Sequence, residues 1–207
     1  MMKTSYYSLL IAVFILIITG CELENENNDK RTIVGEGPIV TKSLDFASFS
    51  KIDNSGVANF YITIGTPQSV VLKAQQNIID AMTYEVTGQT LFVGLEENLS
   101  IENHEEIRFD ITIPSISGIE LSGVGDFILA GDDQDVLTID FIGVGNVEAF
   151  DMKVGTCYIT LTGVGKCEVY VKDILDVTIT GVGNVYYKGN PVITSSITGM
   201  GQLINSN

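Results

Sequence analysis

The sequence predicts an all-β fold: a single-stranded parallel β-helix, or β-solenoid, whose coils repeat roughly every 18–20 residues. Three observations predict it. A glycine–X–glycine triplet recurs five times at nearly constant spacing in the second half of the chain. Apolar and polar residues alternate on both sides of each triplet, which is the period of a β-strand. One repeat of this length cannot enclose a core, whereas stacked repeats bury a continuous one.

The chain begins with the features of an export signal, over residues 1–20. Lys3 supplies a positive charge, Ser8–Ile18 is apolar, and two small residues precede Cys21. A cysteine at this point resembles the bacterial lipobox, in which the thiol receives a lipid and the chain is cut before it. We therefore expect residues 1–20 to be a lipoprotein signal peptide and Cys21 to be the lipidation site, a membrane anchor. The alternatives are a plain secretory signal with an incidental cysteine, or an uncleaved anchor.

Residues 21–32 are predicted to be an acidic flexible tether. The segment ELENENNDKR has no apolar periodicity and cannot bury enough surface to order itself. Residues 33–207 are long enough for one well-buried domain, the β-solenoid. An acidic stretch behind a lipidated cysteine resembles the export signal of surface lipoproteins in the Bacteroidota. That resemblance implies an outer-membrane lipoprotein of the cell envelope, either periplasmic or surface-exposed.

The charge of the chain bears on its partners. Without residues 1–20, which hold Lys3 and no acid, ten Lys and Arg remain against 26 Asp and Glu, a net charge of −16. A charge of this sign argues against nucleic acid as a partner and against electrostatic docking on anionic lipid.

The first part of the domain carries a weaker version of the repeat. Val40–Phe49 is predicted as the first strand and as a cap over one end of the solenoid. An early coil follows at Ile52–Ile62, with Gly56 at its corner. The segments VVLKA, MTYEVTGQTLFVGL and IRFDITIP are strand-like, with a turn at Gly88. Leu95–Glu106 is predicted to be an acidic loop.

The glycine triplets are predicted to be the corners of the later coils. Their leading glycines are 20, 20, 18 and 18 residues apart. Glycine permits a close approach of two backbones, and we expect the residue between each pair of glycines to point into the core. The polar segment Gln202–Asn207 is expected to blunt the exposed edge of the last coil. The predicted corner glycines are Gly56, Gly123, Gly125, Gly143, Gly145, Gly163, Gly165, Gly181, Gly183, Gly199 and Gly201.

Two cysteines lie within the repeats. Cys157 and Cys167 occupy positions that hold Leu, Ile or Val in the other repeats, which predicts buried free thiols. A disulfide is the alternative in an oxidising compartment. Opposed sheets lie about 10 Å apart, which is too far for a bond between two inward-facing cysteines on different walls.

Motifs for bound cofactors and metals are incomplete. The segment GVGKC lacks the first glycine and the hydroxyl residue of a phosphate-binding loop, because Thr160 and Cys167 stand there. The glutamates of Leu95–Glu106 lack the spacing of known calcium loops, and His104 has no Cys or His near it. We therefore expect no catalytic residue, no cofactor and no metal ligand.

Three blocks of sequence carry a resemblance to a known family. They are FSKIDNSGVANFYITIG, then SVVLKAQQNIIDAMTYEVTGQTLFVGL, then FDITIPSISGIELSGVGDF. In this order they resemble the auto-transporter adhesin head GIN domain family, found mainly in Bacteroidota lipoproteins, from Phe46 to the C-terminus. The resemblance implies a right-handed β-helix and an adhesin-like role, and it identifies no binding residues. The repeat is longer than in trimeric adhesin heads, so the oligomeric state stays open.

The sequence favours a lipid-anchored envelope protein that is not an enzyme and that binds a glycan or a protein. Five aromatic residues near the C-terminal coils are candidates for stacking on sugars: Phe150, Tyr158, Tyr170, Tyr186 and Tyr187. One alternative is a periplasm-facing structural or stress-linked lipoprotein. Another is a carbohydrate-active enzyme, for which the candidates are Asp126, Asp140, Lys166 and Glu168. An outward pair of acids lining a groove would favour the enzyme.

Overall fold

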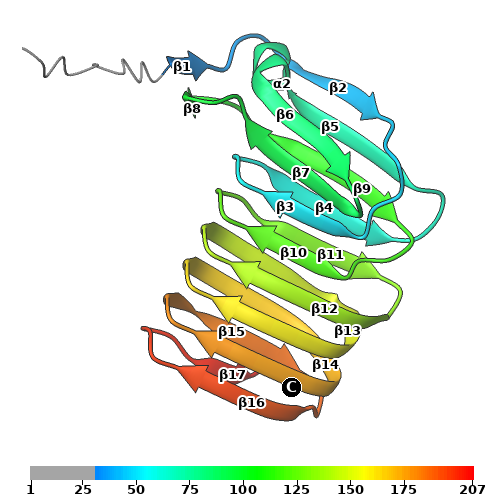
Figure 1. Cartoon of the computed structure of the whole chain (residues 1–207), viewed down its shortest axis with the longest axis vertical. Helices are drawn as coiled ribbons and strands as arrows, with labels where there is room; N and C mark the ends of the chain where they lie inside the picture. The colour runs from blue at the N-terminus through cyan, green and yellow to red at the C-terminus, as the bar shows by residue number, and fades with distance from the viewer. Residues whose placement is uncertain (1–30) are drawn as a thin grey trace, which may run out of the picture.

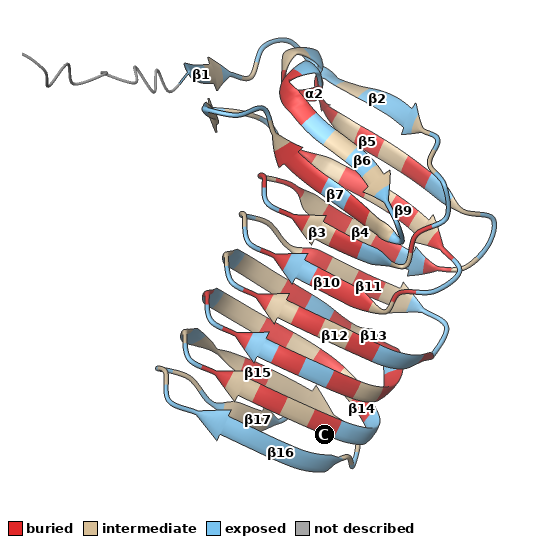
Figure 2. Ribbon diagram, in the orientation of Figure 1, coloured by how far each residue is buried: buried red, intermediate tan, exposed pale blue. Residues whose placement is uncertain are grey.

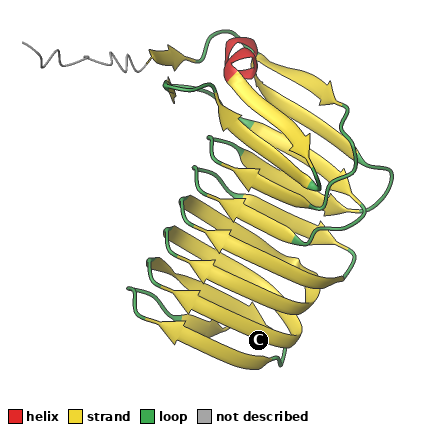
Figure 3. Ribbon diagram, in the orientation of Figure 1, coloured by secondary structure: helices red, strands yellow, loops and turns green. Residues whose placement is uncertain are grey.

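In the computed structural model, which describes residues 31–207, the chain is all-β apart from the short helix α2 (Gln76–Ala81) (Figure 3). The strands are β1 (Arg31–Val34), β2 (Ile39–Leu44), β3 (Lys51–Asn54), β4 (Asn59–Ile64), β5 (Ser69–Gln75), β6 (Met82–Thr87), β7 (Thr90–Leu95), β8 (Leu99–Glu102), β9 (Arg108–Ile113), β10 (Gly118–Leu121), β11 (Phe127–Gly131), β12 (Gln134–Phe141), β13 (Val144–Leu161), β14 (Val164–Ile179), β15 (Val182–Lys188), β16 (Val192–Ile197) and β17 (Leu203–Asn205). None of the helices within residues 31–207 has the length and apolarity needed to cross a membrane.

All strands except β1 and β8 belong to one large sheet, which curls so that two halves face each other (Figure 1). The front half contains β6, β7, β3, β10, β12, the second parts of β13 and β14, and β16. The back half contains β2, β5, β9, β4, β11, the first parts of β13 and β14, β15 and β17. We call a front strand and the back strand that follows it in the chain a rung. The rungs stack along the long axis of the molecule.

Neighbouring rungs of the second half of the chain pair in parallel, one repeat apart. Ile139 of β12 lies beside Ile159 of β13, and Ile159 in turn lies beside Val177 of β14. The first of these repeats is two residues longer than the second, and the difference is absorbed at the corner opposite the glycine triplets. There the pairing of β13 with β14 shifts register between Ala149 and Thr156.

Apolar side chains from both halves form one core between the halves (Figure 2). The alternation along each strand produces it, because every second residue points inward. At the centre of one part of this core, the ring of Phe60 stacks on Phe109 and Phe127, with centroid distances of 5.1 and 4.5 Å. These three residues lie in register on β9, β4 and β11, so the aromatic column follows from the pairing of the strands.

Cys157 and Cys167 are both free and fully buried in this core, as the sequence predicts. Burial raises the pKa of Cys157 to about 12. Burial also raises the pKa of Cys167 well above its ordinary value, with smaller contributions from Cys157 and Glu168. The two thiols therefore act as small apolar side chains rather than as nucleophiles.

The glycine triplets lie at the corner where each front strand passes into its back strand. Backbone hydrogen bonds connect successive rungs at this corner. The N–H of Val144 donates to the carbonyl of Gly123 at 3.0 Å, and the N–H of Val164 donates to the carbonyl of Gly143 at 2.9 Å. Gly145 has a φ of 154°. A Cβ on it would overlap the carbonyl oxygen of Gly125 in the previous corner. The corner therefore requires glycine because two backbones are in contact.

The residue between the glycines does not point into the core, so that expectation from the sequence is wrong. Val124, Val144 and Val164 are 47%, 51% and 51% exposed. The physical reason is that this residue stands at the apex of the corner, with the inward positions taken by the last residue of the front strand and by Phe127, Val147 or Cys167. The valines form an outward row along one edge of the molecule.

The N-terminal end departs from the uniform parallel stack that the sequence predicts. β7 and β9 form a rung that pairs with β3 and β4 on the side away from β10 and β11. In the chain, however, this rung lies between those two rungs. β2, β5 and β9 pair antiparallel, as do β6 and β7, and α2 joins β5 to β6. Antiparallel strands and a helix thus replace further rungs at this end.

Two predicted segments, the acidic loop and the C-terminal segment, differ from the prediction, and a third, the signal peptide with Cys21, lies outside the described residues. Within the predicted acidic loop, Leu99–Glu102 forms β8 and pairs with β1, which begins at Arg31, inside the predicted tether. Leu203–Asn205 is itself a strand of the last rung, paired with β15, and therefore does not cover that rung's edge. Residues 1–20 and Cys21 lie outside the described residues.

Candidate functional site

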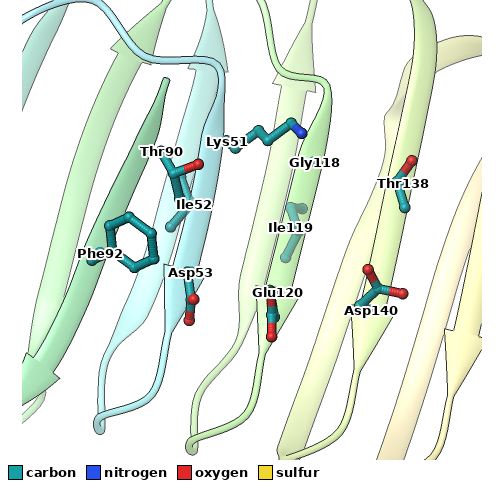
Figure 4. Close-up of a pocket in the computed structure, with 10 residues that line it drawn as sticks. All are labelled: Lys51, Ile52, Asp53, Thr90, Phe92, Gly118, Ile119, Glu120, Thr138 and Asp140. Atoms are coloured by element: carbon teal, nitrogen blue, oxygen red, sulfur yellow. The ribbon is translucent and has the colours of Figure 1, made fainter. Parts of the chain in front are cut away.

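A hollow of about 270 Å³ lies on the outer surface of the front half (Figure 4). It spans four neighbouring strands, β7, β3, β10 and β12, and two rows of side chains line it. The first row is Thr90, Lys51, Gly118 and Thr138, which are partners in register. The second row, two residues further along each strand, is Phe92, Asp53, Glu120 and Asp140.

Gly118 is the one outward position of the first row without a side chain, and it is buried because the stem of Lys51 extends over it (Figure 4). A Cβ there would lie 3.3 Å from Cγ of Lys51, whose flexible stem lies beside it. On the neighbouring strands the outward positions carry Lys51 and Thr138, which form the sides. Phe92, 40% exposed, lies at the β7 end of the hollow (Figure 4).

Three carboxyl groups stand side by side along the second row. Asp53, Glu120 and Asp140 lie on adjacent strands in direct register, and strands are spaced about 4.8 Å apart. Burial raises the pKa of Asp53. Glu120 is largely exposed, yet partial removal of its carboxyl group from water raises its pKa, and the negative charges of Asp53 and Asp140 raise it further. Like charges directly opposite one another destabilise a sheet, so this row costs stability where the acids are ionised.

We expect Glu120→Gln to stabilise the protein at neutral pH and to lose that advantage in acid. The pKa of Glu120 is raised in the folded state, so folding favours its protonated form. The resulting stability is fully present below the ordinary value of 4.5 and is lost as the pH rises through the raised pKa. The measurement is the midpoint of urea unfolding of both proteins from pH 7 down to pH 4. The shift should be small, because Glu120 is exposed.

Glu148→Gln is the matched control for the pH experiment. Glu148 lies on the back half and accepts a hydrogen bond from Nζ of Lys166 at 3.3 Å. Removing its charge deletes an attractive contact, so this variant should be no more stable than the wild type at neutral pH. A Glu120→Gln variant that is equally or less stable at pH 7 would contradict the repulsion inferred for the acid row.

The hollow offers the chemistry of a site for a polar ligand. Ionised carboxylates accept hydrogen bonds, the hydroxyls of Thr90 and Thr138 both donate and accept, and the ammonium of Lys51 donates. Lys51 has no ion-pair partner among residues 31–207. An aromatic face beside convergent polar groups is a common arrangement for binding a small ligand.

The four acid–base candidates from the sequence do not come together. Asp126, Lys166 and Glu168 project from the back half, whereas Asp140 lies in the hollow of the front half. Asp126 accepts hydrogen bonds at 2.8 Å from the backbone and side-chain nitrogens of Asn146 in the next rung. Lys166 forms ion pairs with Glu148 and Glu168 at 3.3 and 2.9 Å. The contacts of Asp126 with Asn146 and of Lys166 with Glu148 join neighbouring rungs, whereas that of Lys166 with Glu168 lies within β14.

The five aromatic candidates do not form one surface either. Tyr158 lies on the front half, exposed, while Tyr187 packs on the core at the back. Nζ of Lys188 lies 4.3 Å from the ring centroid of Phe150, and Nζ of Lys153 lies 5.3 Å from that of Tyr170. Phe150 and Tyr170 are therefore already in contact with a cation. Phe92 is the aromatic residue that lines the hollow, and Tyr158 lies on the strand next to it, in register with Thr138.

Sequence reasoning missed Lys51, Asp53, Phe92 and Gly118. A usable signal was present for the acids, because Asp53, Glu120 and Asp140 each follow an isoleucine in the same repeat position. Phe92 had no such signal, since β7 lies outside the regular repeat. Among residues 31–207 there is no group of three or more His, Cys, Asp and Glu placed to hold a metal ion.

Comparisons with known proteins bear on the whole domain. The family model described as "Putative auto-transporter adhesin, head GIN domain" matches residues 48–141 and 122–191. No curated protein matches the chain. A solved structure of a putative adhesin from Bacteroides fragilis is 24% identical, with a TM-score of 0.58, over 84% of this chain and 100% of that one. A putative adhesin from Parabacteroides merdae is 16% identical, with a TM-score of 0.46, over 85% and 99%. The likeness in fold rests on the first of these.

Proposed function

This chain belongs to the auto-transporter adhesin head GIN domain family, as the resemblance of its sequence blocks predicts, and from that premise we propose that it is an adhesin-like binding module. The module works without catalysis at the cell envelope. Its ligand is a neutral glycan, and its binding site is the hollow over Gly118. The observation that carries this proposal is the convergence of Phe92, three carboxyl groups and Lys51 around one solvent-open depression.

Neutral sugars match this set of groups better than charged ligands do. Their hydroxyls donate to carboxylates and accept from an ammonium, and the apolar face of a sugar ring packs on an aromatic side chain. The acid row would repel a ligand that carries carboxylates or sulfates. A protein ligand, which the sequence also allows, needs a larger contact area than a hollow of this size supplies.

Calorimetric titration with a panel of neutral and acidic oligosaccharides tests the proposal. We expect neutral members to bind, and Gly118→Val to abolish binding without unfolding the protein, because valine suits a strand and fills the hollow. Thr178→Val is the matched control: it adds an apolar outward residue to the same face, outside the hollow. The proposal fails if no oligosaccharide binds the wild type, or if Gly118→Val binds as tightly as Thr178→Val.

A carbohydrate-active enzyme is the second candidate, favoured by the acid row itself. Carboxyl groups on adjacent strands are separated by about 5 Å, close to the separation in retaining glycosidases. Against it, Glu120 is exposed to water, and electrostatic catalysis is strongest where water is excluded. Product analysis after long incubation with each bound oligosaccharide separates the two. An enzyme releases shorter sugars and loses turnover but not binding in Glu120→Gln, whereas a binding module releases none.

The proposal extends to the architecture and the anchor. The stacked rungs are the coils of a single-stranded parallel β-helix, which the in-register parallel pairing of successive repeats supports. Its hand is right-handed, as parallel crossover connections nearly always are. A lipid on Cys21 holds the domain at the outer membrane, where the acidic tether lets it face outward.

Protease treatment of intact cells, followed with an antibody to the domain, tests that orientation. Cleavage of the wild type in intact cells supports a surface-exposed adhesin-like module. Protection until the outer membrane is opened overturns the surface location and favours a periplasm-facing structural lipoprotein. Cys21→Ala is the control, since it should release the domain from the membrane fraction if the cysteine carries the lipid.

A further inference from the structure

The last rung of the molecule, β16 and β17, leaves one end of the sheet open. β16 pairs only with β14 and β17 only with β15 among residues 31–207, and all six residues of β16 are exposed (Figures 1 and 2). We propose that this rung is the surface on which two copies of this chain join end to end.

The backbone of β16 is in position to pair with a second strand. The N–H of Thr198 donates to the carbonyl of Ile179 in the previous rung, at 2.9 Å. Backbone groups alternate in direction along a strand, so Ile193, Ser195 and Ile197 direct their N–H and C=O groups to the open side. An unpaired row of this kind is a template for another strand.

The inward side chains of this rung occupy core positions, but no further rung packs over them within residues 31–207. Ile193 and Ile197 lie in register with Leu175 and Ile179, which are fully buried, yet they are 39% and 40% exposed. Val192 and Met200 are 73% and 75% exposed, whereas their outward counterparts in the previous rung, Ile174 and Val182, are 44% and 42% exposed. Joining a second rung here would cover Ile193 and Ile197 and part of this outward pair, and removal of apolar surface from water is the main driving force for association.

Charge identifies the occupant as a second copy. From Gly189 to Asn207 the chain contains no Asp, Glu, Lys, Arg or His, although residues 21–207 carry a net charge of −16. Two such acidic bodies repel each other along their sides and can approach at a neutral end. The opposite end lacks this character, because its edge strands β2 and β6 carry Lys42 and Glu85. Charged residues on an edge strand discourage pairing.

A twofold axis that crosses the open end lets the front strand β16 and the back strand β17 each pair with the same strand of a second copy. β16 then pairs antiparallel with β16 of the second copy, and β17 with its counterpart, so one patch serves as its own partner. Repulsion between the two acidic bodies opposes this contact, and salt screens that repulsion. Association is therefore expected to strengthen as the salt concentration rises.

Two adjacent serines provide a matched pair of variants. Ser195 lies in register with the inward Val177, and Ser196 lies in register with the outward Thr178. Ser195→Lys puts a charge into the proposed contact, whereas Ser196→Lys adds the same charge to the outer face. Sedimentation of the full chain from about 1 µM to about 1 mM measures association in each. We expect the wild type and Ser196→Lys to form dimers, and Ser195→Lys to weaken the dimer at least about tenfold.

Hydrogen exchange locates the contact. The amides of Ser195 and Ile197 should become protected as the protein concentration rises, while those of β2 and β6 do not change. If Ser195→Lys fails to fold, Ser195→Pro removes one open-side donor and serves instead. A chain that stays monomeric over the whole range, or an association that Ser195→Lys leaves unchanged, overturns the proposal. So does a β16 that gains protection only from a different protein.

Discussion

Gly145→Ala is expected to destabilise the protein by about 3–5 kcal/mol, near the upper limit for a single substitution. The Cβ of alanine would overlap the carbonyl oxygen of Gly125, and the φ of 154° at Gly145 disfavours a side chain. Because the overlapped atom belongs to the backbone of the neighbouring rung, no change of side-chain conformation relieves the clash. The two rungs must separate, and the hydrogen bond from Val144 to Gly123 is lost with their packing.

Gly65→Ala is the control for this prediction. A Cβ at Gly65 would lie 3.7 Å from Cγ2 of Thr112, an ordinary contact. Alanine there should change the free energy of unfolding by less than about 1 kcal/mol, in either direction. Urea unfolding followed by far-ultraviolet circular dichroism measures both variants. Equal stability of Gly145→Ala and Gly65→Ala would show that the corner tolerates a side chain.

Phe60→Ala is the second large effect, with an expected loss of about 3–5 kcal/mol. Phe60 is fully buried between the rings of Phe109 and Phe127, and alanine leaves a cavity that flanking strands cannot fill. For a chain of this size, each kcal/mol lowers the melting temperature by about 2–4 °C, so a fall of roughly 10 °C is expected. Differential scanning calorimetry measures it.

Phe92→Ala separates stability from binding. Phe92 is 40% exposed at the wall of the hollow, so its loss should change the unfolding free energy by no more than about 0.5 kcal/mol. The same variant should bind the neutral oligosaccharide of the titration experiment more weakly than the wild type does. Strong destabilisation by Phe92→Ala, or a stable Phe60→Ala, would contradict the assignment of the two rings to wall and core.

The regular part of the fold was predictable because one physical constraint recurs in it. Each corner needs glycine where backbones meet, and each strand needs alternate apolar residues, so the pairing of Ile139 with Ile159 follows from the spacing of Gly143 and Gly163. The position of the valines was not predictable in the same way. A valine between two glycines can point into the core or out to solvent, and the sequence pattern does not distinguish these two directions.

The N-terminal end was unpredictable for a topological reason. The strand patterns of β5, β6, β7 and β9 were visible in the sequence. No local sequence feature, however, indicates that β7 and β9 pair with β3 and β4 on the side away from β10 and β11. The candidate site inherits this difficulty, because its wall, Phe92, comes from β7. The acids of the hollow share one repeat position and could have been found by aligning Ile52 with Ile119 and Ile139.

The two corners of each rung differ in how they tolerate insertion. At the glycine corner, contact between backbones sets the number of residues, so an added residue breaks the contact with both neighbouring rungs. At the opposite corner, the register between Ala149 and Thr156 already absorbs a difference of two residues without disturbing the core. The molecule therefore has one rigid seam and one adjustable seam. New loops, whether acquired in evolution or added by design, can be displayed along the adjustable seam.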